Sequence, residues 1–201
     1  MREPGVEEGC LAVPRSAGAV REGTDSASDE TRAAELTLIA AARDGDRGAF
    51  GALYRQYGRL VHGIVLARVS RADVDDLVQD VFLQAMRQLS TLRDPRAFGG
   101  WLAAIARNLT TDHLRRTPRV AEMPADIAVA SGERTQALAV LDIIRTLPEA
   151  YRETLVLRLV EGMTGPEISA RTGLTPASVR VNLHRGMRQL RERLEGSGRR
   201  A

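Results

Sequence analysis

The 201-residue sequence lacks the residues that several kinds of functional site require. Its single cysteine, Cys10, excludes both an internal disulfide and a cysteine cluster for zinc. The three histidines, His62, His113 and His184, are scattered and do not have the spacing of metal ligands. No catalytic constellation is recognisable either. We therefore expect a protein that is not an enzyme and that needs no metal, cofactor or small-molecule substrate.

Long hydrophobic runs are also missing. No apolar stretch approaches the length of a membrane span, and the acidic N-terminus does not resemble a signal peptide, so we expect a cytoplasmic protein. Lysine is absent as well, an absence that a GC-rich genome explains and from which we infer no function. Hydrophobic residues make up 43% of the chain and charged residues 27%, which is ordinary for a globular protein with packed cores.

The charge that is present is unevenly distributed. Residues 1–30 contain three arginines and seven acidic residues, whereas residues 167–201 contain eight arginines and three acidic residues. A basic C-terminal segment favours an anionic partner, and nucleic acid is the first candidate.

Helical periodicity dominates the first half of the chain. Residues 1–30 are rich in small and acidic residues without periodicity and should be a disordered tail. From residue 31 to 116, apolar residues recur at helical spacing, with breaks at Asp44–Asp46, near Ser70 and before Asp94. Asp94 can cap the last of these helices, and Pro95 suits its first turn. The pattern predicts a first domain made only of helices.

The second half predicts another small helical domain. Residues 117–134 contain two prolines and no helical period, which is typical of a flexible linker. Residues 135–195 then form helices, and residues 196–201 form a basic tail. We expect Leu159, Val160 and Leu194 among the buried residues of this domain. The fold class is therefore all-α, with two small helical domains joined by a linker.

The end of the second domain carries a specific signal. Thr164 and Glu167 make a capping box with a proline in the first turn of a short helix, and Gly173 lies in the tight turn that follows. Thr175 then caps a longer helix whose exposed face is rich in arginine. This order is the signature of a helix-turn-helix, which lays its second helix in the major groove of DNA. The alternative is a helical hairpin used only for packing.

Two further surfaces in the first domain have possible functions. On the helix from Ser70, Asp80 lies too far from the helix N-terminus for the helix dipole to explain it. It forms an acidic patch with Asp76 and Gln79 that is either a protein-docking surface or a solvated face. On the helix from Asp94, the only tryptophan, Trp101, precedes a stripe of hydrogen-bond donors. Aromatic rings beside arginines suit single-stranded nucleic acid, although an amphipathic helix with a half-buried tryptophan has the same pattern.

Taken together, these motifs resemble those of bacterial RNA polymerase sigma factors of the extracytoplasmic-function class. The resemblance rests on DDLVQDVFLQA at 75–85, FGGWLAAIARNLTTDHLRR at 98–116 and LPEAYRETLVLRLVEGMTGPEISARTGLTPASVRVNLHRGMRQLRE at 147–192, in this order and spacing. It differs from the common pattern at Leu92, where an aromatic residue is frequent, and at Val181 and Asn182, where small polar or basic residues are.

The resemblance implies three sets of site residues. Residues expected to bind core RNA polymerase are Asp75, Asp76, Gln79, Asp80 and Phe82. Residues expected to capture the melted minus-ten promoter element, together with the preceding loop 92–97, are Trp101, Arg107, Asn108, Thr111, Arg115 and Arg116. Residues expected to bind the minus-thirty-five duplex are Pro176, Ser178, Arg180, Val181, His184 and Arg185.

The resemblance also implies the partners: core RNA polymerase, promoter DNA and a cognate anti-sigma factor. Two other functions would suit parts of the sequence. A one-component helix-turn-helix regulator would bind duplex DNA without polymerase, but the first domain shows neither a clear ligand pocket nor a clear dimer helix. A helical adaptor that binds only proteins would leave the arginine-rich faces unexplained.

Overall fold

The computed structural model describes residues 22–116 and 132–198, and within these ranges every regular element is a helix. Most of the tail expected at 1–30 and of the linker expected at 117–134 lies outside the described residues, as do the last three residues of the basic tail expected at 196–201. Where the structure describes them, at 22–30, 132–134 and 196–198, these segments belong to helices. Helices α2 to α8 belong to one compact unit, and we call its two helical groups, α2–α4 and α5–α8, the first and the second domain. Helix α1 runs from Glu22 to Arg43 and so begins upstream of the expected start at residue 31. No glycine or proline interrupts the sequence between Gly23 and Gly45, which lets the helix extend.

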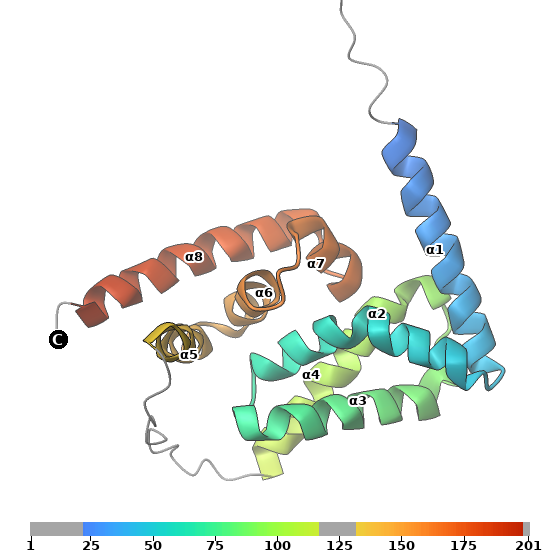
Figure 1. Ribbon diagram of the computed structural model, residues 1–201, viewed down its shortest axis with the longest axis horizontal. Helices are drawn as coiled ribbons and strands as arrows, with labels where there is room; N and C mark the ends of the chain where they lie inside the picture. The colour runs from blue at the N-terminus through green and yellow to red at the C-terminus, as the bar shows by residue number, and fades with distance from the viewer. Residues whose placement is uncertain (1–21, 117–131, 199–201) are drawn as a thin grey trace, which may run out of the picture. The chain divides into compact units, whose positions relative to one another are not determined.

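Helices α2, α3 and α4 form the first domain (Figure 1). Helix α2 spans Arg47–Leu66, α3 spans Val74–Gln88 and α4 spans Phe98–Arg116, and each pair packs together. Short 3₁₀ turns at Arg71–Asp73, Leu89–Thr91 and Pro95–Ala97 join them.

The starts of these helices follow local rules. The Asp46 carboxylate accepts hydrogen bonds from the backbone N–H groups of Gly48 and Ala49, which caps α2 as expected for an N-cap aspartate. Asp94 accepts from the backbone N–H of Arg96 at 2.9 Å, so it caps the short 3₁₀ turn that leads into α4.

Fully buried side chains from all three helices, among them Leu53, Val81 and Leu102, form the core of the first domain.

Helices α5 to α8 form the second domain. Helix α5 spans Gly132–Arg145, α6 spans Glu149–Leu159, α7 spans Gly165–Thr172 and α8 spans Pro176–Gly198. Figure 1 shows α8 as the long final helix that follows the short α7. Ile144, Leu155 and Ile168 are buried at the centre of this domain.

Three residues that the periodicity placed inside the second domain are exposed. Leu159 and Val160 are 46% and 48% exposed, and Leu194 is 38% exposed. The first two lie where α6 ends, just before the chain turns at Gly162, whose φ is 64°. Leu194 lies in the last turns of α8, beyond the buried Leu190. The apolar pattern of each helix continues past the last residue that neighbouring helices cover. Periodicity therefore overestimates how much of each helix is buried.

The two domains are in direct contact, which the sequence did not predict. Helix α2 packs on α6, and α4 packs on α7. The Arg145 side chain donates hydrogen bonds to the carbonyl oxygens of Leu66 and Val69, and the Arg171 side chain donates to that of Gln56 at 2.7 Å. Gly63 allows the close approach of α2, since a Cβ there would lie 2.6 Å from Leu157 Cδ2.

Candidate nucleic-acid interface

The hairpin of α7 and α8, where the sequence predicts a helix-turn-helix, is shaped by a capping box and one glycine. Thr164 Oγ1 accepts from the Glu167 backbone N–H, and the Glu167 carboxylate accepts from the Thr164 backbone N–H at 2.7 Å. The Thr164 hydroxyl also donates to the Glu167 carboxylate, at 2.8 Å, and the hydrogen bonds from the Thr164 backbone and hydroxyl hold the pKa of Glu167 below its usual value. Gly173 ends α7 with φ 76°, a left-handed conformation that a residue with a side chain adopts only with strain. The expected capping box and glycine turn are confirmed.

The free face of α8 carries the side chains expected to meet duplex DNA. Arg180, Val181, His184 and Arg185 are all exposed. Their spacing of four residues, 180 to 184 and 181 to 185, places them on one side of the helix. Two more candidates, Pro176 and Ser178, lie in the first turn, where the Thr175 hydroxyl accepts from the Ser178 backbone N–H at 3.1 Å. Arg180, Val181, His184 and Arg185 thus share one exposed side of α8, while Pro176 and Ser178 lie in its first turn.

Aromatic packing holds Trp101 in place near the N-terminal end of α4. Trp101 is half-buried, with its ring centroid 5.8 Å from that of Phe98, which in turn lies 5.0 Å from Tyr57. This stack holds the tryptophan in place while leaving part of the ring accessible. Leu92, at the start of the loop before α4, is buried, so it supports the loop and is not a surface contact.

The hydrogen-bond donors along α4 differ in whether they are exposed and in whether they already have a partner within the helix. Asn108 is exposed and open to a ligand, and Arg115 and Arg116 are exposed near the end of the helix. Arg115 lies 3.7 Å from Asp112, a solvent-exposed pair that contributes little stability. The Thr111 hydroxyl instead donates to the Arg107 carbonyl oxygen at 2.7 Å, so its hydrogen is used within the helix.

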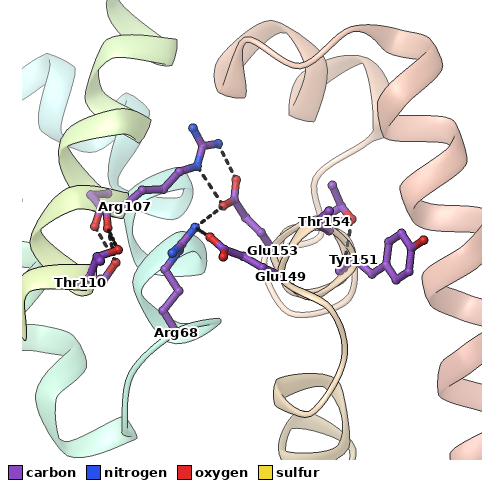
Figure 2. A network of polar contacts seen from close by, with 10 residues as sticks. Arg68, Arg107, Thr110, Glu149, Tyr151, Glu153 and Thr154 are labelled. Atoms are coloured by element: carbon purple, nitrogen blue, oxygen red, sulfur yellow. Dashed lines mark hydrogen bonds and ion pairs between the residues drawn. The ribbon is translucent and has the colours of Figure 1, made fainter. Parts of the chain in front are cut away.

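Arg107 has a partner in the second domain (Figure 2). Its Nε and Nη2 atoms donate to the two carboxylate oxygens of Glu153, at 3.0 and 2.6 Å. The hydrogen bonds with Glu153 raise the pKa of Arg107 further above its ordinary value. Arg68, which follows α2, also contacts Glu153 and pairs with Glu149. None of the three partner residues stood among the expected site residues.

Another polar contact between the two domains involves a histidine. His62 Nδ1 on α2 lies 2.6 Å from Glu161 Oε1, just beyond α6. The hydrogen bond with Glu161 raises the pKa of His62, against the opposing effect of burial, and the negative charges of Glu161 and Asp75 act in the same direction. The contact is strongest when the imidazole is protonated.

The acidic patch of α3 is a real surface feature. Asp75, Asp76, Gln79 and Asp80 are exposed, and the apolar Leu83, 37% exposed, lies on the same helix. The exposure of these side chains fits both a protein-docking surface and a solvated face, because a single exposed leucine is common on protein surfaces.

Phe82 does not belong to that surface. It is only 4% exposed, and its ring packs 4.4 Å from Tyr54 and 6.5 Å from Phe50 between centroids. Little of the ring is therefore accessible to a partner, and its direct contact with core polymerase stays a prediction. The ring faces α2 and so helps to hold α3, which carries the patch, against that helix.

Other kinds of site find no support in the part of the chain that the structure describes. Its side chains include no group of three residues that could hold a metal ion. None of its helices combines the length and the hydrophobicity needed to cross a membrane.

Comparison with known proteins identifies both domains. Residues 53–120 match the family Sigma-70 region 2, and residues 137–190 match the family Sigma-70, region 4. The chain is 34% identical over 162 residues to RNA polymerase sigma factor CarQ of Myxococcus xanthus, covering 76% of this chain and 92% of CarQ. It is 30% identical over 180 residues to ECF RNA polymerase sigma factor BldN of Streptomyces coelicolor, covering 82% of this chain and 67% of BldN.

A solved structure shares the fold. The structure of CnrH in complex with the cytosolic domain of CnrY matches with a TM-score of 0.60 at 30% identity. The match covers 81% of this chain and 98% of CnrH.

Proposed function

This chain belongs to the extracytoplasmic-function class of RNA polymerase sigma factors and directs promoter-specific transcription initiation, and we propose that it does so through three surfaces. The acidic patch of α3 docks on core RNA polymerase. Helix α4 and the loop before it capture the melted minus-ten strand. The exposed face of α8 anchors the factor on the minus-thirty-five duplex.

The observation that carries this proposal is the free face of α8. Arg180, His184 and Arg185 project from one side of a helix that follows a glycine turn, with no other described element covering them. Arginine forks at that position reach base edges and phosphates of a major groove. A helical hairpin used only for packing would have no reason to expose three such side chains together.

The role of α4 follows from what strand capture requires. Opening a promoter takes bases out of the stack, which costs a few kcal/mol per base, and a bound single strand offsets that cost. Trp101 offers part of a ring for stacking, and Asn108 offers an exposed amide that can read a base edge. Arg115 and Arg116 add positive charge for the strand's phosphates.

We also propose a protein that inhibits this chain and the compartment in which it acts. The structural relative CnrH is bound to the cytosolic domain of CnrY. By analogy, we propose that a cognate anti-sigma factor holds this chain inactive in the cytoplasm. The chain would contribute binding surfaces, and the chemistry of RNA synthesis would belong to the polymerase.

Transcription in vitro tests whether α8 binds the duplex and α4 captures the melted strand. Promoters are first selected from a genomic fragment library by the chain with core polymerase, and run-off transcription is then measured. Arg180→Ala should weaken duplex binding by about 1–3 kcal/mol. Asn108→Ala should bind the closed duplex normally but lose permanganate-reactive open complex. The matched control is Arg47→Ala, which removes the same charge from an exposed position at the start of α2.

Two outcomes would contradict the proposal. If Arg180→Ala and Asn108→Ala lost duplex binding equally and opened normally at saturation, the assignment of the two surfaces would be wrong. If the wild-type chain bound and regulated duplex DNA but gave no transcript with core polymerase, a one-component regulator would be the better description.

A further inference from the structure

A buried anion-binding arrangement lies where the first and second domains meet. The Glu153 side chain is 7% exposed, and its Oε2 atom accepts from Arg107 Nε at 3.0 Å and lies 3.6 Å from Arg68 Nη2 (Figure 2). Both guanidinium groups approach the same carboxylate oxygen. The two arginines therefore share one anionic partner. Both arginines come from the first domain, and the anion comes from the second.

Arg68 is only partly satisfied by this arrangement. Its side chain is 9% exposed, and its Nη2 atom is shared between Glu149 and Glu153. Its Nε atom is buried and has no hydrogen-bond partner among the described residues. A buried polar atom without a partner costs free energy, so native structures rarely keep one without a reason. An additional oxygen atom on the bound anion would satisfy it.

Two adjacent guanidinium groups suit a phosphate at least as well as a carboxylate. The paired N–H donors of arginine match the oxygen spacing of both anions, and a phosphodiester is tetrahedral where a carboxylate is flat. Arg107 also precedes Asn108 on α4, the helix proposed to hold the melted strand. The position of the two arginines is therefore suited to a phosphate of that strand.

We propose that Arg68 and Arg107 form a phosphodiester site for captured single-stranded DNA, and that Glu153, with Glu149, occupies this site in the closed arrangement of the two domains. The inference rests on the proposed function of α4 and adds Arg68 to the residues that bind the strand. It also means that domain closure and strand capture compete for the same two side chains. Closure then acts as a built-in inhibitor of strand binding.

Competition predicts a specific non-additivity between two substitutions. In the wild-type chain, Arg107→Ala weakens closure and strand binding together, so the two effects oppose each other and the apparent affinity changes little. In a Glu153→Gln background, closure is already weakened, and Arg107→Ala removes a charge-assisted contact that the strand uses. That loss should be about tenfold.

The experiment measures binding of a fluorescent oligothymidylate of about 12 nucleotides, within the range of single-strand site sizes, to the full chain. The variants are Glu153→Gln, Arg68→Ala, Arg107→Ala and the two arginine substitutions in the Glu153→Gln background. Glu192→Gln is the matched control, because it removes one carboxylate from an exposed ion pair within α8. Circular dichroism checks that each variant keeps its helicity, and Glu149→Gln provides a second way to weaken closure if Glu153→Gln does not fold.

Glu153→Gln should tighten oligothymidylate binding several-fold, and Glu192→Gln should change it less. The dependence of log Kobs on log salt should steepen by about 0.7 for each arginine released to the strand. Inorganic phosphate added at constant ionic strength should not displace the oligonucleotide, and displacement by it would show that the ligand is a free anion instead.

Equal affinities for wild type and Glu153→Gln, with additive effects of the arginine substitutions, would overturn the inference. Transcription separates this failure from that of the proposed function. If Arg107→Ala still impairs promoter opening while Glu153→Gln leaves strand affinity unchanged, α4 binds the strand and the carboxylate does not compete. If neither arginine affects opening in any background, both the strand-binding role of α4 and the inference built on it are wrong.

Discussion

The packing of α2 on the second domain can be tested with one added methyl group. Gly63 is a helical glycine, so Gly63→Ala should stabilise α2 itself by about 1 kcal/mol through helix propensity. The new Cβ would, however, lie 2.6 Å from Leu157 Cδ2 and 2.9 Å from Glu161 Cγ, both in the second domain. Carbon atoms normally approach to about 3.5–4.0 Å, so the closed arrangement must shift to accept it.

The size of the effect follows from these two opposing contributions. Overpacking a well-packed site costs about 1–3 kcal/mol, and Leu157 has no exposed surface through which to move away. The helix-propensity gain is present whether the domains are together or apart, whereas the overlap exists only when they are together. Gly63→Ala should therefore shift the closed-to-open equilibrium toward the open form by about 1–3 kcal/mol.

Gly58→Ala is the matched control. Gly58 lies on the same helix, and a Cβ there would meet no atom within 4 Å. It should gain the same helix propensity without disturbing the contact. For a domain of this size, about 1 kcal/mol raises the melting temperature by about 4–8 °C.

Small-angle scattering and thermal unfolding measure the two outcomes separately. Gly58→Ala should melt at a higher temperature with an unchanged radius of gyration, and Gly63→Ala should show an increased radius of gyration. If Gly63→Ala matched Gly58→Ala in both measurements, α2 would not pack against Leu157 in solution. The proposed competition at Glu153 would then lose its structural basis.

Three further predictions concern the other features of the structure. Thr164→Ala should destabilise the second domain by about 1 kcal/mol in urea unfolding, because it removes the N-cap hydroxyl of α7. Asp76→Arg with Asp80→Arg should keep normal helicity but lose co-purification with core polymerase, and undiminished co-purification would refute the docking role of the patch. Because Glu161 raises the pKa of His62, their contact should stabilise closure fully below about pH 6.5 and lose this contribution as the pH rises through the raised pKa. His62→Gln should abolish that pH-dependent change in the radius of gyration.

Local features of the fold were predictable from the sequence because short-range physics determines them. The carboxylate of Asp46 reaches backbone N–H groups two and three residues away, and the capping box of Thr164 closes over three residues. Gly173 is needed because the chain reverses there with a positive φ. Such contacts depend on few degrees of freedom, so residue type and spacing are enough to predict them.

Burial at the edges of the core was harder to predict. Phe82 and Leu83 are neighbours on α3, both are apolar, and only Leu83 is exposed. Leu159 continues the apolar pattern of α6 but lies beyond the helices that would cover it. The helical period shows which residues share a face, but the positions of neighbouring helices decide which of them are covered. That information is not contained in a single helix.

The pairing of Arg107 with Glu153 shows why part of the site could not be predicted at all. The two residues are 46 positions apart, and Arg68 and Glu149 are 81 apart, with the segment at 117–134 between the members of each pair. From the sequence, Arg107 is a surface cation on a donor stripe, and Glu153 is one acid in an ordinary helix. Burying Glu153 is tolerable only because the two arginines accompany it, so its environment is created by the packing of the two helical groups against each other. Arg107 therefore has two possible partners, the Glu153 carboxylate and a phosphate of the DNA strand. The relative free energies of domain closure and strand capture decide which one it binds.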